Sequence, residues 1–289
     1  MTTVFLGTEA TATGAATPGE LRYRYRRLFP NVYAPRDVEP TLGLRTIAAS
    51  LWSGRVGVVT GRAAAAWHGA KWIDPDAPIE LVYDCKRPPA GIVTRNERLA
   101  PDEFVVRGGV RVASVGRTAF DLGRFLPPEK AVAHLDALAN RTGMTADDVL
   151  PLVERYRGAR GTRKLRTAVD LMDAGAQSPK ETWLRLLLIR NGFPRPTTQI
   201  PVYDDFGWVF GYLDMGWADL KIAVEYDGDH HRTDRVRYAW DVKCLRKIGQ
   251  RGYLHIKVID EDSEADIVRR VERAWAVRES ALSVARRAS

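Results

Sequence analysis

The chain has 289 residues, of which 45% are hydrophobic and 28% charged, and its formal net charge is +8. This length suits two domains, and the composition is that of a globular protein. There is no run of 18 apolar residues, and the two cysteines, Cys85 and Cys244, lie far apart. We therefore expect a cytoplasmic protein with reduced thiols and no membrane partner. The basic excess favours an anionic partner such as DNA, although the arginine usage of a GC-rich genome explains it equally well.

The first half predicts a mixture of strands and helices. Residues 1–18 are rich in Thr, Ala and Gly and predict a flexible tail. Tyr23–Tyr33 predicts two short strands about Pro30-Asn31, and Thr41–Trp52 predicts a helix with one apolar face. Further strands are expected at 79–83, 92–95 and 104–112, and further helices at 118–122 and 129–139.

A domain boundary is predicted near residue 175. Arg157–Arg163 is a basic, glycine-rich turn, and a helix ends at Ala174–Gln177. Ser178-Pro-Lys-Glu181 then has the pattern of a capping box, which starts a new helix. We expect one domain over 19–175 and a second over 176–289.

The second domain has the predicted order α-β-β-β-α-β-α. Its first helix reaches Asn191, and two strands follow on either side of Asp204–Gly207. The remaining elements are a strand at Leu220–Tyr226, a basic helix at Arg235–Gly249, a strand at Tyr253–Ile259 and a helix at Ser263–Ala288. The fold class is therefore α/β.

Acidic residues stand where buried strands end. Asp214 closes one apolar run, and Glu225 and Asp227 lie near the end of the next. Unpaired buried charge is costly, so a basic side chain or a metal ion is expected beside these carboxylates. Hard oxygen ligands suit Mg²⁺ or Mn²⁺, and such ions support phosphodiester hydrolysis. Ten residues separate Asp214 from Glu225, enough for a turn and a strand that bring the two side chains together.

At this point a family resemblance is visible. The second domain resembles the PD-(D/E)xK restriction-endonuclease-like superfamily, and more narrowly the domain of unknown function 559, a relative of very-short-patch-repair endonucleases. The similarity covers roughly residues 176–262. It is carried by Ser178–Leu188, Gly192–Pro196, Gln199, Leu213–Trp217, Lys221–His231, Asp241 and Gly252-Tyr253.

This resemblance implies a three-layer domain with a mixed sheet and Mg²⁺-dependent cleavage or nicking of DNA. Asp214 and Glu225 would be the metal ligands, and Glu181 an accessory acid. Asp227 occupies the position of the superfamily's lysine, so another cation is required there. The substitutes are His230, His231 or Lys243, with His231 as the catalytic candidate; without one the site is inactive.

The first domain resembles the AbiEi-type antitoxins of actinobacteria. The resemblance is carried by Thr60–Ala70, Arg117–Arg124 and Ala131–Ala137. It implies a toxin protein as a partner and a DNA-binding winged helix at the start of the chain. The residues before Tyr23 are too few and too rich in Gly and Thr for recognition helices, so we expect only the wing-like strand pair to remain.

A basic segment offers contacts to the phosphate backbone of DNA. Its members are Arg232, Arg235, Arg237, Lys243, Arg246 and Lys247. A solvated helix face explains them equally well. Likewise, capping explains Glu181, and a turn explains Asp227. Two functions therefore stay open: a Mg²⁺-dependent endonuclease, or a DNA-binding or toxin-neutralising regulator whose nuclease fold is inactive.

Overall fold

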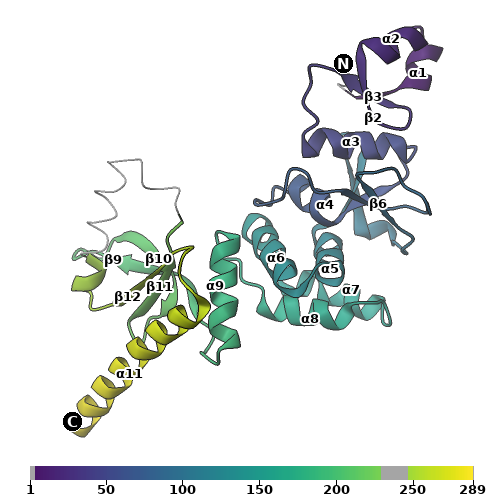
Figure 1. The fold of residues 1–289 in the computed structure, drawn as a ribbon. Helices are drawn as coiled ribbons and strands as arrows, with labels where there is room; N and C mark the ends of the chain where they lie inside the picture. Colours follow the sequence, from purple (N-terminus) through teal and green to yellow (C-terminus); the bar gives the residue numbers. More distant parts are fainter. Residues whose placement is uncertain (1–3, 229–246, 289) are drawn as a thin grey trace. The chain divides into compact units, whose positions relative to one another are not determined.

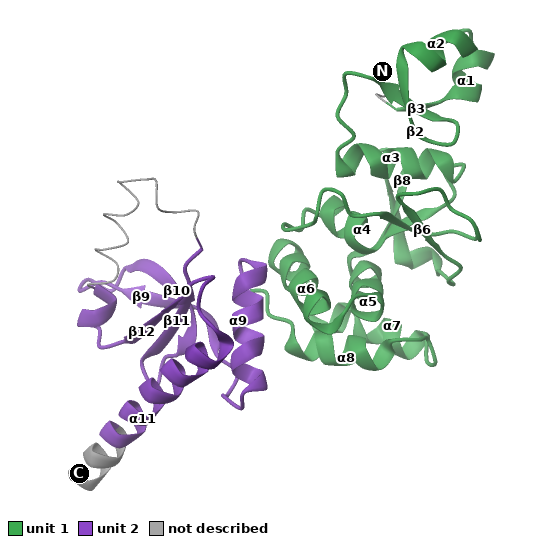
Figure 2. Cartoon of the chain, viewed as in Figure 1, with its two compact units in different colours: residues 1–174 green, residues 175–289 purple. Residues whose placement is uncertain are grey.

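The structure is a computed structural model that describes residues 4–228 and 247–288 (Figure 1). The chain divides into two compact units, residues 1–174 and 175–289 (Figure 2). The fold is mixed α/β, and the described residues form three sheets of three, five and four strands. None of the described helices is long and apolar enough to cross a membrane.

The chain begins with a small sheet and two helices. The elements are β1 (Phe5–Leu6), α1 (Gly7–Ala12), α2 (Pro18–Tyr23), β2 (Tyr25–Phe29) and β3 (Val32–Pro35). The strands are antiparallel in the order β1-β3-β2. The tail expected over residues 1–18 is therefore folded from residue 4 onward. Buried Ala10, Ala16 and Leu21 pack against aromatic side chains of the sheet. Thr17 and Glu20 form the capping box that starts α2.

A five-stranded sheet follows, in the order β6-β5-β4-β8-β7. Its elements are α3 (Leu42–Trp52), β4 (Val58–Thr60), α4 (Gly61–Trp67), β5 (Ile79–Val82), β6 (Ile92–Arg95), η1 (Pro101–Glu103), β7 (Phe104–Arg107) and β8 (Val110–Ala113). Helix α3 begins after Thr41, whose hydroxyl accepts the N–H of Leu44. Its buried Ala48 and Ala49 belong to one core with residues of both sheets. The single strand expected over 104–112 is a hairpin, because Gly108 and Gly109 adopt positive φ.

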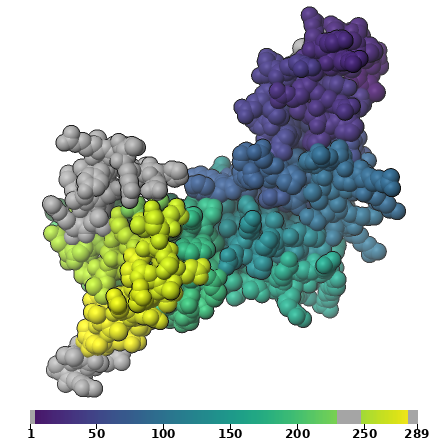
Figure 3. All heavy atoms as spheres, viewed as in Figure 1, coloured from purple at the N-terminus to yellow at the C-terminus, as the bar shows by residue number. Residues whose placement is uncertain are grey.

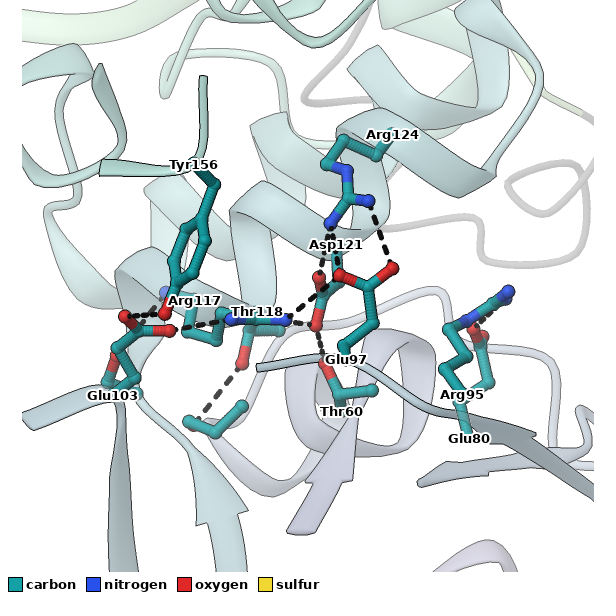
Figure 4. Close-up of polar contacts among 12 residues, drawn as sticks. Thr60, Glu80, Arg95, Glu97, Glu103, Arg117, Thr118, Asp121, Arg124 and Tyr156 are labelled. Carbon is teal, nitrogen blue, oxygen red and sulfur yellow. Dashed lines mark hydrogen bonds and ion pairs between the residues drawn. The ribbon is translucent and has the colours of Figure 1, made fainter. Parts of the chain in front are cut away.

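Helices complete the first unit around a buried network of charges (Figure 4). They are α5 (Val115–Phe125), α6 (Pro128–Thr142), η2 (Ala146–Asp148), α7 (Leu150–Arg155) and α8 (Thr162–Leu171). At the centre, fully buried Arg117 donates to Glu103 at 2.6 Å and to Asp121 at 3.1 Å. The Asp121 carboxylate also accepts the Thr60 hydroxyl, and Glu103 accepts that of Tyr156. This network ties the strands to the helices of the unit.

The second unit is a four-stranded mixed sheet with helices packed on it. Its elements are α9 (Pro179–Arg190), β9 (Thr197–Tyr203), β10 (Val209–Trp217), β11 (Ile222–Tyr226), β12 (Leu254–Val258) and α11 (Glu264–Ala288). The order is β12-β11-β10-β9, with β11 and β12 parallel and the other pairs antiparallel. One core joins the sheet to α9 and α11, and a second, smaller core lies around Ala223 and Ile248. Helix α11 lies at the surface of this unit (yellow in Figure 3).

Candidate functional site

Asp214 and Glu225 lie at the same end of the β10–β11 ladder. Met215 pairs with Val224 and Gly216 with Ala223, and Asp214 and Glu225 each lie one residue beyond the Met215–Val224 pair. The backbone N–H of Tyr226 donates to Asp214 Oδ2 at 3.1 Å. Gly216 permits this close pairing, because a Cβ there would meet the Ile222 carbonyl oxygen at 2.1 Å. The two strands therefore bring together the two carboxylates that the sequence singled out.

Asp214 lies among other negative charges. Burial raises the pKa of Asp214 to about 7, and the charges of Glu181, Glu225 and Asp227 contribute to the rise, against the N–H of Tyr226. A buried carboxyl with such neighbours takes up a proton at a higher pH than an exposed carboxyl does. Three candidate carboxylates thus act on the fourth, Asp214, and the electrostatics around Asp214 favour an added cation.

Glu181 enters the cluster from helix α9. Ser178 caps this helix, since its hydroxyl accepts the Glu181 N–H at 3.1 Å. The Glu181 carboxylate accepts the N–H of Gln177 at 2.9 Å and is 8% exposed. Burial raises the pKa of Glu181, and the hydrogen bonds of its carboxylate with the Gln177 N–H and the Ser178 hydroxyl oppose the rise. The Ser178 cap that the sequence predicted is therefore present, whereas the Glu181 carboxylate accepts the N–H of Gln177 in place of the Ser178 N–H of a capping box, and its charge acts on Asp214.

Strand β12 supplies two basic side chains that sequence reasoning missed. His255 Nε2 lies 2.5 Å from Glu225 Oε2, and Lys257 Nζ donates to Asp227 Oδ2 at 3.0 Å. Because β11 and β12 are parallel, Glu225 pairs directly with Lys257. The alternation of polar and apolar residues along 254–258 is the signal that marks His255 and Lys257 as neighbours on one face.

Most of the expected DNA contacts lie outside the described residues. These are Arg232, Arg235, Arg237, Lys243 and Arg246, and the histidines His230 and His231 lie outside them as well. Lys247 is described and exposed, with Nζ 4.7 Å from the centroid of the Phe210 ring. The Lys247 ammonium therefore lies at the surface of the second unit.

The carboxylate cluster meets the ligand preference of Mg²⁺. Among the residues that the structure describes, no three His, Cys, Asp or Glu side chains form a ready-made metal site. Mg²⁺ needs no such cage, because it usually takes one or two carboxylates and keeps several waters. Asp214 and Glu225 would be that pair. Burial and, after it, the neighbouring carboxylates raise the pKa of Asp214, and a bound cation would oppose that rise.

A second charged feature lies at the beginning of the chain. Helix α2 and the β2–β3 hairpin enclose a cleft of about 480 Å³. Its lining includes the arginines Arg22, Arg26, Arg27 and Arg36 and the tyrosines Tyr25 and Tyr33. The Arg36 guanidinium donates to the Arg22 carbonyl oxygen at 3.1 Å and so joins the hairpin to α2. Two short helices, α1 and α2, precede this hairpin, so the expectation of a strand pair without helices before it was wrong.

Comparison with known proteins places relatives in mycobacteria. Two proteins of Mycobacterium tuberculosis, one from strain CDC 1551/Oshkosh and one from strain H37Rv, are each 26% identical to this chain over 263 residues. The similarity spans 86% of this chain and 93% of each relative, and both are named only as uncharacterized proteins. No family model matches the chain, and no solved structure matches it.

Proposed function

We propose that the second unit is a Mg²⁺- or Mn²⁺-dependent DNA endonuclease or nickase, built as a three-layer domain of the restriction-endonuclease-like type. The observation that carries the proposal is that Asp214 and Glu225 lie at the same end of the β10–β11 ladder. The charges of Glu225, Glu181 and Asp227 all contribute to the raised pKa of Asp214. A cluster of perturbed carboxylates beside basic side chains is typical of a catalytic site.

In this reaction a water oxygen forms a bond to phosphorus while the bond from phosphorus to the leaving oxygen breaks. The attacking water loses a proton, and the leaving oxygen gains one from solvent. The bound metal would supply Lewis acidity to the phosphate and to the water. Asp214 and Glu225 would hold it. Glu181 adds negative charge near Asp214, and His255 restrains Glu225 through their 2.5 Å contact.

Nicking of supercoiled plasmid tests the proposal. The wild-type chain should relax plasmid in Mg²⁺ or Mn²⁺ and not in chelator. Asp214→Asn and Glu225→Gln should each abolish the reaction, because they nearly keep side-chain shape and remove a ligand charge. Asp219→Asn is the matched control, since Asp219 is an exposed carboxylate in the turn between β10 and β11. No metal-dependent nicking by the wild type on duplex, single-stranded or mismatched DNA, with no ion bound by calorimetry, would refute it.

A second candidate is a DNA-binding protein that does not cleave. The arginine-lined cleft between α2 and the β2–β3 hairpin favours it, because guanidinium groups suit phosphate oxygens. Arg22, Arg26 and Arg27 are exposed there. In this function the first unit binds duplex DNA, and the carboxylates of the second unit serve another purpose.

Fluorescence anisotropy with labelled duplex DNA tests this binding. The double variant Arg22→Ala/Arg26→Ala should weaken affinity and lower the slope of log K against log salt by about two, one for each lost phosphate contact. Arg87→Ala, an exposed arginine between β5 and β6, should leave both quantities unchanged. Equal affinity of the double variant and the wild type at every salt concentration would exclude the cleft as the DNA site.

A further inference from the structure

The carboxylate cluster has a basic partner on the neighbouring strand. Strand β12 runs parallel to β11, and its register pairs Ala223 with His255 and Glu225 with Lys257. Paired residues of a ladder point to the same face of the sheet. His255 and Lys257 therefore stand on the face of Glu225 and contact the acidic residues at short range.

The two basic side chains, His255 and Lys257, differ in how far they are exposed to solvent. The His255 side chain is 12% exposed and lies against Glu225, which is 19% exposed. The Lys257 side chain is 39% exposed, and its partner Asp227 is 40% exposed. His255 is thus enclosed by the fold, whereas the Lys257 ammonium lies between a carboxylate and solvent. A phosphate that approaches Asp214 and Glu225 from solvent would meet the ammonium and not the imidazole.

Positive charge beside the metal accelerates phosphodiester hydrolysis, because negative charge builds up on the phosphate oxygens in the transition state. A lysine ammonium is a compact point charge with three donors, and it can contact a carboxylate and a phosphate together. Lys257 has the required charge and exposure, and its 3.0 Å contact with Asp227 fixes its position beside Glu225.

We propose that Lys257 is the phosphate-facing cation of this site, held by Asp227 and aimed at the scissile phosphate when DNA is bound. The inference rests on the proposed nuclease function. It assigns to β12 the positive charge that the sequence sought in His230, His231 or Lys243. Asp227 then acts as the anchor of that cation, which explains an acid at this position of β11.

The test compares Lys257→Met, which removes the charge, with Lys257→Arg, which keeps it. Cleavage is measured under single-turnover conditions with saturating protein, and Mn²⁺ affinity is measured by calorimetry without DNA. Lys257→Met should cleave about 10²- to 10³-fold more slowly, as expected for loss of one charge that stabilises the transition state. Its Mn²⁺ affinity should stay equal or rise by up to about tenfold, because a neighbouring positive charge is gone. Lys257→Arg should recover part of the rate.

Arg273→Met is the matched control for loss of one positive charge, since Arg273 is exposed on α11. Its rate and Mn²⁺ affinity should equal those of the wild type. Unchanged cleavage by Lys257→Met would overturn the inference and leave the nuclease proposal intact. Loss of both cleavage and Mn²⁺ binding, with a lower melting temperature, would make Lys257 structural and also overturn it. A wild-type chain that neither cleaves DNA nor binds Mn²⁺ would overturn the nuclease proposal and this inference with it.

Discussion

Replacing Asp214 by Asn should stabilise the protein, and the gain should grow as the pH rises to neutral. The ordinary pKa of an aspartate is 3.8, and burial together with three neighbouring carboxylates raises that of Asp214 to about 7. Between these values the folded chain keeps a proton that the unfolded chain loses. The free energy of unfolding therefore falls as the pH rises from about 4 to about 7.

The size of the effect follows from the two pKa values. At about 1.4 kcal/mol per pH unit, the interval from 3.8 to about 7 corresponds to about 4 kcal/mol at pH 8. Asparagine carries no charge and can still accept the N–H of Tyr226. Asp214→Asn should therefore be more stable than the wild type by about 4 kcal/mol at pH 8 and by about 2 kcal/mol at pH 5.

Urea denaturation of the full chain, fitted as one transition for each compact unit, measures this gain. Asp214→Asn should raise the urea midpoint of the transition of the second unit alone. Asp219→Asn should leave the midpoints of both transitions unchanged. Mg²⁺ should raise the midpoint of the wild type and not that of Asp214→Asn, because only the wild type has the ligand charge. A gain that does not change with pH, or no gain at pH 8, would refute the reasoning.

Two further predictions concern the first unit. Burial, with a smaller contribution from the charge of Arg62, lowers the pKa of His134 from 6.5 to about 4, so the unfolded chain takes up the proton first as the pH falls. The first unit should lose about 2 kcal/mol between pH 8 and pH 5, and His134→Gln should remove most of that loss in pH-dependent urea denaturation; an unchanged slope would contradict it. Arg117→Met leaves Glu103 and Asp121 buried without their shared cation, and should cost about 3–5 kcal/mol in the same experiment. The exposed Arg107→Met is its control, and a loss below about 1 kcal/mol for Arg117→Met would mean that the network contributes little.

Local signals in the sequence predicted much of the fold. Thr41 and Ser178 start α3 and α9 as N-caps, because their hydroxyls accept backbone N–H groups three residues later. The beginning of the chain was misjudged, since Thr, Ala and Gly suggested a tail. The burial of Ala10 and Ala16 there depends on Tyr25 and Tyr33, which come later in the chain. Small residues carry little hydrophobic signal of their own, so tertiary contacts decided the structure.

The candidate site, too, could be predicted from the sequence only in part. Asp214 and Glu225 could be predicted, because β10 and β11 are consecutive and antiparallel, and a short turn fixes their register. The contacts of Glu225 with His255 and of Asp227 with Lys257 each join residues 30 positions apart. They depend on parallel pairing of β11 with β12, which no local pattern specifies. The basic side chains of the cluster, His255 and Lys257, could therefore be identified only from the structure.

The energetics of the cluster bear on the choice between the two proposed functions. A carboxylate at Asp214 destabilises the folded state at neutral pH, whereas an asparagine would keep the hydrogen bond from Tyr226 without that cost. An unfavourable charge of this kind is typical of sites where a residue is retained for function and not for stability. A protein that bound DNA through the arginine cleft alone would have no use for it. The unfavourable charge of Asp214 therefore favours a site that binds a cation, and the contact of Lys257 with Asp227 favours a phosphate as the substrate.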